Sequence, residues 1–219
     1  MGDIRADGTL AYGAVIGSNV GSKEVVALLE ITAEIRAMRS KWRYRGGSRP
    51  HFAVQPGPGQ ESVWDYPRPP EISLDSRCLD VSYDGRRIAR SASTKKVVET
   101  AGAPTFYFAS GDVDTDCLIS SDRTSVCEWK GLAVSVDLIA GPKDVGWRYI
   151  DTFPEFTEIG GFYAFYPGKL DCRIDGETAL PQGGGYYGGW ITSDLVGPFK
   201  GDPGTVSYTH LTLPTSDLV

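Results

Sequence analysis

The chain has 219 residues, of which 41% are hydrophobic and 23% charged, and its net charge is −6 at neutral pH. This composition is typical of a globular protein with one sizeable core, and the acidic balance argues against a nucleic-acid or anionic-membrane partner. No apolar stretch approaches the ~20 residues that span a membrane, and the first residues lack the order of a signal peptide, so we expect a cytoplasmic protein.

Residues 1–49 are interpreted as an N-terminal extension with one helix and a basic linker. A helix is expected over residues 23–39, with Ser22 as its N-cap and apolar side chains on one face at Leu28, Ile31, Ile35 and Met38. A basic run from Arg36 to Arg49 overlaps the end of this helix, and it is typical of a solvated linker and less so of a phosphate-binding patch. The extension either docks on the domain or results from a start codon placed too early, and the sequence leaves both open.

Residues 50–205 have the pattern of a β domain. Five prolines between residues 56 and 70 predict an extended, largely irregular arm. Leu79, Val81 and Tyr83 then alternate with polar residues, and Asp84-Gly85 predicts a type I′ turn that returns the chain over residues 86–90. Residues 105–108 are expected to form a short aromatic strand.

The second half of the domain continues with short strands and tight turns. Residues 132–138 alternate between apolar and polar, and Gly141-Pro142 allows residues 145–150 to pair back. Residues 162–166 and 170–174 follow as further strands. Sequential hairpins predict a compact, mainly β, antiparallel domain, with helix confined to short pieces near residues 94–100 and 154–159.

Residues 206–219 are expected to be foreign to the protein. Reverse translation of residues 206–215 resembles the transposon-derived adapter of short-read library preparation, and such scars are excluded from fold reasoning as tags are. On this interpretation the natural sequence is truncated after Thr205. His210 then belongs to the adapter, which leaves only His51 for a histidine-dependent nucleophilic mechanism, and His51 precedes the predicted strands.

Six long motifs identify relatives of this chain. They are residues 57–70 (GPGQESVWDYPRPP), 99–105 (ETAGAPT), 127–131 (CEWKG), 161–168 (GFYAFYPG), 185–192 (GYYGGWIT) and 196–201 (VGPFKG). Together they resemble the family catalogued as domain of unknown function 427, over about residues 50–205. The resemblance implies a β-tent-like fold, the architecture of methionine sulfoxide reductase B and of cereblon's thalidomide-binding domain. Relatives with that fold often hold zinc on two C-x-x-C knuckles, and this sequence has neither.

The family also has a nucleotidyltransferase-like label. Such enzymes need a Gly-Ser turn that opens a helix and paired acids on a strand to hold Mg²⁺. Asp112, Asp114 and Asp116 offer acids at alternate positions. Gly17-Ser18 offers a turn, but it lies outside the resembling segment. A solvated acidic turn is the alternative interpretation of the three aspartates.

The run Glu128-Trp129-Lys130-Gly131 contains the candidate catalytic residues. If a regular strand passes through it, Glu128 and Lys130 face the interior and Trp129 points outward. Inward charges must be paired or lie at the mouth of a cavity, because an isolated buried charge is too unfavourable. A bulge at Gly131 is the alternative, and it would bury Trp129 instead.

The predicted ligand-binding residues are Glu99, Tyr107, Trp129, Tyr187 and Trp190. Tyr187 and Trp190 lie among glycines, where the backbone can approach a ligand and the rings offer flat faces to a planar or cationic group. Their alternative interpretation is as core aromatics. Glu99 and Tyr107 flank a Gly-Ala-Pro turn, and both are expected to line the same cleft. 

Two classes of function remain open, with nucleotidyl transfer as a third. The first is a small-molecule site, with or without catalysis, and the second is a non-catalytic module that binds a protein. A concave cleft with Glu128, Lys130 and Trp190 favours the first, and a flat exposed aromatic patch favours the second. The expected partner is a small-molecule ligand of unknown identity, with no nucleic acid, no membrane and no cofactor.

Folding is expected to need no metal. The cysteines are Cys78, Cys117, Cys127 and Cys172, and none forms the C-x-x-C pair of a structural zinc site. Dialysis against a chelator should therefore leave the melting temperature of the purified protein unchanged. Stoichiometric zinc in elemental analysis, together with unfolding by the chelator, would contradict this.

Overall fold

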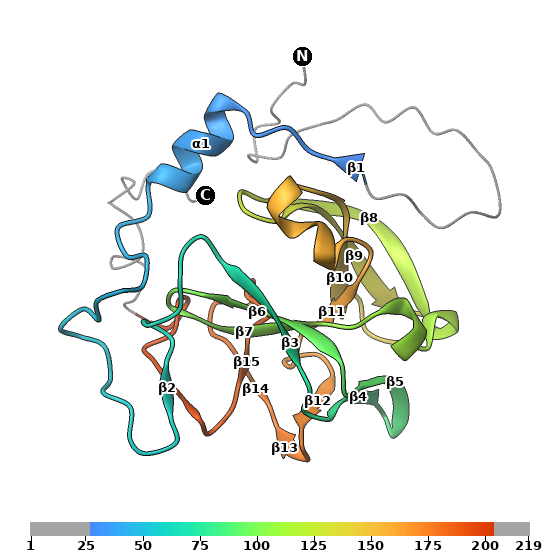
Figure 1. Ribbon diagram of the computed structural model, residues 1–219. Helices are drawn as coiled ribbons and strands as arrows, with labels where there is room; N and C mark the ends of the chain where they lie inside the picture. Colours follow the sequence, from blue (N-terminus) through green and yellow to red (C-terminus); the bar gives the residue numbers. More distant parts are fainter. Residues whose placement is uncertain (1–26, 204–219) are drawn as a thin grey trace.

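The computed structural model describes residues 27–203 of the chain (Figure 1). Ser22, Gly17-Ser18 and the predicted adapter at residues 206–219 lie outside the described residues. Within them, short strands predominate and most strand pairs are antiparallel, which confirms the mainly β fold expected from the sequence. None of the helices among these residues is long and apolar enough to cross a membrane.

A five-stranded sheet forms one side of the fold, at the upper right of Figure 1. Its strands in spatial order are β1 (Ala27–Leu28), β10 (Gly146–Thr152), β9 (Gly131–Leu138) and β8 (Leu118–Cys127), with β11 (Tyr163–Phe165) also on β10. The period-2 pattern of residues 132–138 and the turn at Gly141-Pro142 correctly predict the β9–β10 hairpin. β1 pairs with β10 in parallel.

Two smaller antiparallel sheets and two short strand pairs complete the framework. The first sheet contains β13 (Glu177–Thr178), β12 (Asp171–Ile174), β4 (Leu79–Tyr83) and β5 (Arg86–Ser91). The second contains β3 (Glu71–Asp75), β6 (Thr94–Glu99) and β7 (Gly102–Tyr107). The pairs are β14 (Leu180–Pro181) with β15 (Trp190–Ile191), and β16 (Leu195–Val196) with β2 (Glu61–Ser62). The helical elements are α1 (Ala33–Ser40) and the 3₁₀ turns η1 (Ser110–Asp112), η2 (Thr115–Cys117) and η3 (Pro154–Ile159).

The predicted β4–β5 hairpin is present with its turn at Asp84-Gly85. Both residues have positive φ, 48° and 76°, as a type I′ turn requires. The short helical piece expected near residues 154–159 is also present, as η3. These local signals are reliable because turn chemistry decides them without reference to distant contacts.

The helix expected near residues 94–100 is wrong, because this segment is the strand β6. Thr94, Val97 and Val98 are β-branched and suit a pleated strand better than a helix. β6 lies between β3 and β7 and pairs antiparallel with both, so its backbone groups are bonded on two sides. Tertiary pairing therefore decides its structure.

The predicted N-terminal helix is shorter than expected. Within residues 27–39 the helix begins only at Ala33, because the side chain of Thr32 accepts a hydrogen bond from the Ile35 amide (3.4 Å) and so caps it. Ile35 is buried, whereas Leu28 and Met38 are 60% and 42% exposed. The prediction that these side chains share one buried helix face is therefore wrong as well.

The described part of the extension docks on the β domain. The Arg39 guanidinium donates from Nε to the carbonyl oxygen of Glu128 (2.7 Å) and packs over the rings of Trp129 and Phe153. Arg49 forms a paired contact with the Asp65 carboxylate at 2.7 and 2.6 Å. Part of the basic run therefore makes specific contacts with the β domain, whereas a solvated linker was expected.

Neither alternative for the run at residues 128–131 is correct as it stands. Cys127 pairs with Gly131, so Glu128, Trp129 and Lys130 form the loop of the β8–β9 hairpin. Because a loop does not follow the period of a strand, Trp129 and Lys130 are both buried, at 4% and 9% exposure. Trp129 packs in a core cluster with Tyr149 and Phe156, among others.

We expect Gly131 to be essential to this loop. Its φ is +128°, and a Cβ there would overlap the carbonyl oxygen of Asp151, so Gly131→Ala should destabilise the fold by about 3 kcal/mol or more. Gly85→Ala is the matched control, because Gly85 also has positive φ but open space around it, and should cost about 1–2 kcal/mol. Urea melts of both variants measure the difference, and equal losses would contradict the proposed close approach.

Candidate functional site

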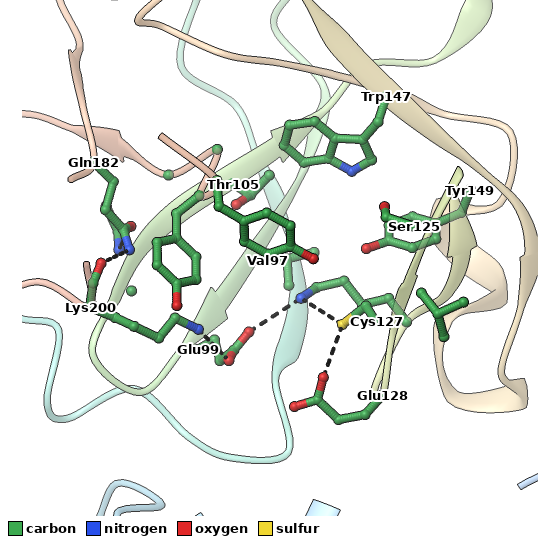
Figure 2. A pocket seen from close by; sticks show the side chains of 18 of the residues that line it. Val97, Glu99, Thr105, Ser125, Cys127, Glu128, Trp147, Tyr149, Gln182 and Lys200 are labelled. Atoms are coloured by element: carbon green, nitrogen blue, oxygen red, sulfur yellow. Dashed lines mark hydrogen bonds and ion pairs between the residues drawn. The ribbon is translucent and has the colours of Figure 1, made fainter. Parts of the chain in front are cut away.

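A cavity of about 440 Å³ lies between strands β6 and β7, the β8–β9 hairpin and the glycine-rich stretch before β15. The end of α1 borders it as well, through Met38 and the following Lys41 and Trp42. Lys41, Ser125 and Tyr186 line it and are exposed, so the cavity opens to solvent on their side. Figure 2 shows the side chains that surround it.

Glu99, the last residue of β6, is bound by three cations. Its Oε1 lies 2.8 Å from Nη2 of Arg68 and 3.0 Å from Nζ of Lys200, and its Oε2 lies 3.2 Å from Nζ of Lys130. These four side chains, from the arm, β6, the β8–β9 loop and the segment after β16, are called the charge cluster below. All four are at most 15% exposed, so the cluster is largely shielded from water.

The cluster fixes the protonation states of its members. Burial alone would raise the pKa of Glu99, but the three neighbouring cations outweigh it and hold that pKa well below its ordinary value. Burial likewise would lower the pKa of Lys130, but the Cys127 sulfur and the Glu99 carboxylate outweigh it, and the net shift is upward. Glu99 is therefore ionised and Lys130 protonated throughout the neutral range.

Arg68 and Glu128 are both held by Trp42, which follows α1. The Arg68 guanidinium lies 3.5 Å from the centre of the Trp42 ring, and its Nη2 also donates to the carbonyl oxygen of Thr100 (2.8 Å). The indole Nε1 of Trp42 donates to Glu128 Oε1 at 2.9 Å. The extension therefore supplies a flat face and a hydrogen bond to the site.

Aromatic rings form much of the rest of the cavity surface. We call the following side chains the aromatic wall: Trp42, Tyr107, Trp147, Tyr149, Tyr166, Tyr186 and Tyr187. Trp147 and Tyr149 lie across from Glu99 and Lys200 in Figure 2. Burial raises the pKa of Tyr107 to about 12, so its hydroxyl stays protonated and can donate a hydrogen bond.

Gln182 connects the glycine-rich stretch to the charge cluster. Its Oε1 accepts from the amide of Ala103 (2.9 Å), and its Nε2 donates to the carbonyl oxygen of Lys200 (2.6 Å). A Cβ at Gly189 would overlap both Gln182 Oε1 and the carbonyl oxygen of Ala103, so the close approach requires glycine. This bridge positions the backbone of Lys200 beside the cavity.

The structure brings most of the sequence-predicted site residues together. Glu99, Tyr107, Glu128, Lys130 and Tyr187 all line the cavity. Trp129 and Trp190 do not line it; both are core residues, and Trp190 donates from Nε1 to the carbonyl oxygen of Phe165 (3.0 Å).

Sequence reasoning missed several side chains of the site. They are Arg68, Trp42, Cys127, Trp147, Tyr149 and Lys200. The first two lie in segments interpreted as an irregular arm and a linker, and Lys200 was noted only as part of the motif at residues 196–201. A charged residue that shortly follows two aromatics in a proline-rich stretch, as Arg68 follows Trp64 and Tyr66, was a signal that could have pointed to a buried cation.

The predicted acidic turn lies elsewhere. The carboxylate of Asp112 accepts from the Ser91 hydroxyl (2.7 Å), and that of Asp114 accepts from Arg86 (2.6 Å). Both acids thus have partners in the protein. Among residues 27–203, no group of three or more His, Cys, Asp or Glu side chains is arranged to hold a metal ion.

Comparison with known families agrees with the resemblance seen in the motifs. The family described as a domain of unknown function, DUF427, matches residues 71–176. Residues 71–176 belong to this family. The DUF427 segment runs from β3 to the turn after β12 and contains Glu99, Tyr107, Glu128 and Lys130. Trp42, Tyr187 and Lys200 lie outside it, and no curated protein matches the chain.

Removing the charge of Glu99 should destabilise the fold. Glu99→Gln leaves three cations facing one another without their carboxylate, and breaking a buried ion pair in this way costs about 3–5 kcal/mol. Glu158→Gln is the matched control, since Glu158 pairs with Lys95 on the surface and its loss should cost at most about 1 kcal/mol. Urea melts at neutral pH measure both.

The pH dependence of folding stability tests the direction of the pKa shift of Glu99. The folded-state pKa of Glu99 lies below its ordinary value of 4.5, so the folded state binds fewer protons than the unfolded state there. Its stabilising effect is complete above about pH 4.5 and is lost as the pH falls towards the folded-state pKa. The stability of the wild type should thus decrease more steeply with acid than that of Glu99→Gln, and equal slopes would contradict the assigned shift.

Proposed function

We propose that this protein is a small-molecule-binding domain and that the cavity is its binding site. The observation that supports this is the combination in one cavity of a largely buried charge cluster with an aromatic wall. The volume of about 440 Å³ falls within the range of about 300–1,000 Å³ typical of ligand pockets. A few fixed polar groups in an apolar surround give a small ligand its orientation.

The charge cluster favours binding over proton transfer. A general acid or base works best when its pKa lies near the working pH. The pKa of Glu99 is lowered and that of Lys130 raised, so both move away from neutrality. Groups locked in this way supply a constant electrostatic field, which suits the recognition of a charged ligand.

The other two functions have weaker support. For a protein-binding module we would expect one continuous apolar patch. The exposed apolar side chains include Leu74, Ile119 and Leu180, which lie on strands of three different sheets, β3, β8 and β14. For nucleotidyl transfer, Asp112 and Asp114 already bind Ser91 and Arg86. The cavity therefore remains the best-supported site.

Filling the cavity should strongly reduce ligand retention. Ser125 is an exposed residue of β8 that lines the cavity, so Ser125→Trp introduces an indole there without disturbing the core. Ser120→Trp is the matched control, because Ser120 is an exposed serine of the same strand that does not line the cavity. We expect both variants to fold, and only Ser125→Trp to lose the ligand.

The measurement uses compounds retained from a cell extract. Each protein is incubated with a metabolite extract, desalted and denatured, and the released compounds are identified by mass spectrometry. Wild type and Ser120→Trp should retain the same compound, and Ser125→Trp should retain about tenfold less, which corresponds to ~1.4 kcal/mol. Retention of nothing by the wild type, or equal retention by all three proteins, would refute the proposed function.

A further inference from the structure

The charges around the cavity do not balance. The charge cluster contains three cations, Arg68, Lys130 and Lys200, and one carboxylate, Glu99. Adding Glu128, the second acid at the cavity, leaves three positive charges against two negative ones. Lys41 at the rim adds a further positive charge. The net charge of the chain is −6, so this positive cavity stands against an acidic background.

The two lysines also keep hydrogen-bond donors available. An ammonium group has three N–H donors. Among the described residues, the oxygen bound to each lysine Nζ belongs to Glu99, and Lys130 has in addition only the Cys127 sulfur at 3.8 Å. The Lys200 ammonium otherwise faces the rings of Tyr187 (4.7 Å) and Trp42 (5.3 Å), which accept no conventional hydrogen bond. Both lysines line the cavity, so these donors can meet a ligand.

A cationic ligand is disfavoured by the same contacts. Aromatic walls beside a carboxylate often hold a cation. Here the only carboxylate of the charge cluster is already shared among three protein cations, and an added ligand cation would face them. Like charges only a few ångströms apart repel strongly in surroundings that screen charge poorly. The ring faces are thus available to a flat ligand that carries a negative charge.

We infer that the ligand of this site is an aromatic organic anion. Its carboxylate or phosphate group meets Lys130 and Lys200 beside Glu99, and its planar ring system lies against the aromatic wall. This inference rests on the proposed function and adds to it the chemical class of the ligand. The two sources of the anion, an aromatic carboxylic acid and a phosphorylated aromatic compound such as a nucleotide, share this chemistry and are separated by the test.

The natural cysteines supply a reporter for binding at this site. Cys127 lines the cavity and is partly exposed, Cys78 is partly exposed away from the cavity lining, and Cys117 and Cys172 are buried. A ligand in the cavity should slow the alkylation of Cys127 by iodoacetamide and leave that of Cys78 unchanged. Peptide mass spectrometry measures both rates in one sample, so Cys78 serves as an internal control.

The probes test separately whether the ligand needs a negative charge and whether it needs an aromatic ring. They are 2-naphthoate, its neutral analogue 2-naphthamide, the cation 2-naphthylmethylammonium, cyclohexanecarboxylate, and AMP with adenosine as its uncharged partner. We expect 2-naphthoate to protect Cys127 at a concentration about tenfold lower than 2-naphthamide, and cyclohexanecarboxylate to protect weakly. Protection by AMP below the concentration needed for 2-naphthoate assigns the anion to phosphate, and the reverse order assigns it to carboxylate.

Variants of Lys200 locate the anion. Lys200→Gln should remove the advantage of 2-naphthoate over 2-naphthamide, and Lys200→Arg should restore it in part. Lys95→Gln is the matched control, because Lys95 lies on β6 with Glu99 but pairs with Glu158 outside the cavity. Thermal melts show whether each variant is folded. If Lys200→Gln does not fold, the comparison of Lys200→Arg with the wild type still tests the role of Lys200.

Three results would overturn the inference. They are equal protection by the anion and its neutral analogue, stronger protection by the cation, and no protection of Cys127 by any probe. In each case the proposed function is tested separately, since it would survive if a compound retained from the extract were still lost in Ser125→Trp.

Discussion

The carboxylate of Glu99 allows three cations to be packed together at one end of the cavity. Arg68 belongs to the irregular arm, Lys130 to a hairpin loop and Lys200 to the last described segment, and each lies within 3.2 Å of a Glu99 oxygen. Without that negative charge, these groups would repel one another in surroundings that screen charge poorly. One side chain thus holds three separate parts of the chain against the end of β6.

Neighbouring side chains hold the members of the charge cluster in place. Trp42 covers the guanidinium of Arg68 and binds Glu128, so the acid that partly balances the remaining charge is itself held in place. Gln182 binds the backbone of Lys200 and of Ala103, next to the start of β7. The cavity keeps its shape because its polar groups are bonded to the framework and its rings are packed on one another, as Trp147 is on Tyr166 at 4.6 Å.

Local signals in the sequence predicted much of this fold. The Asp84-Gly85 turn and the alternation in β9 depend on backbone geometry and on one buried face, and both are visible in a few residues. β6 was mistaken for a helix because its identity depends on two partner strands that short-range patterns do not reveal. The loop at residues 128–130 was missed because three-residue hairpin loops lack the Asn-Gly or Asp-Gly signature, and Gly131 was read as a bulge within a strand.

The candidate site was predictable only in its central part. Glu128 and Lys130 stood out as charges expected to face the interior, for which a partner must exist, and Glu99 stood out by its position before the Gly-Ala-Pro turn. That Glu99 is the partner of Lys130, and that Arg68 and Lys200 join them, required the three-dimensional arrangement of segments up to 132 residues apart in sequence, since Arg68 and Lys200 are separated by that distance. Two of the predicted aromatics, Trp129 and Trp190, lie in the core, because the sequence does not distinguish a ring that lines a cavity from one that fills a core.

The boundary of the DUF427 segment has a consequence for how this site can vary. The segment supplies Glu99 and Lys130, whereas Trp42 comes before it, and Tyr187 and Lys200 come after it. Two chains that agree over the segment can thus share the position of the central charges and still present different surfaces to a ligand. Similarity confined to residues 71–176 would transfer Glu99, Lys130 and most of the cavity lining from one chain to another, but not Trp42, Tyr187 and Lys200. Chains that differ in these flanking residues could therefore differ in the ligand that we propose for the cavity.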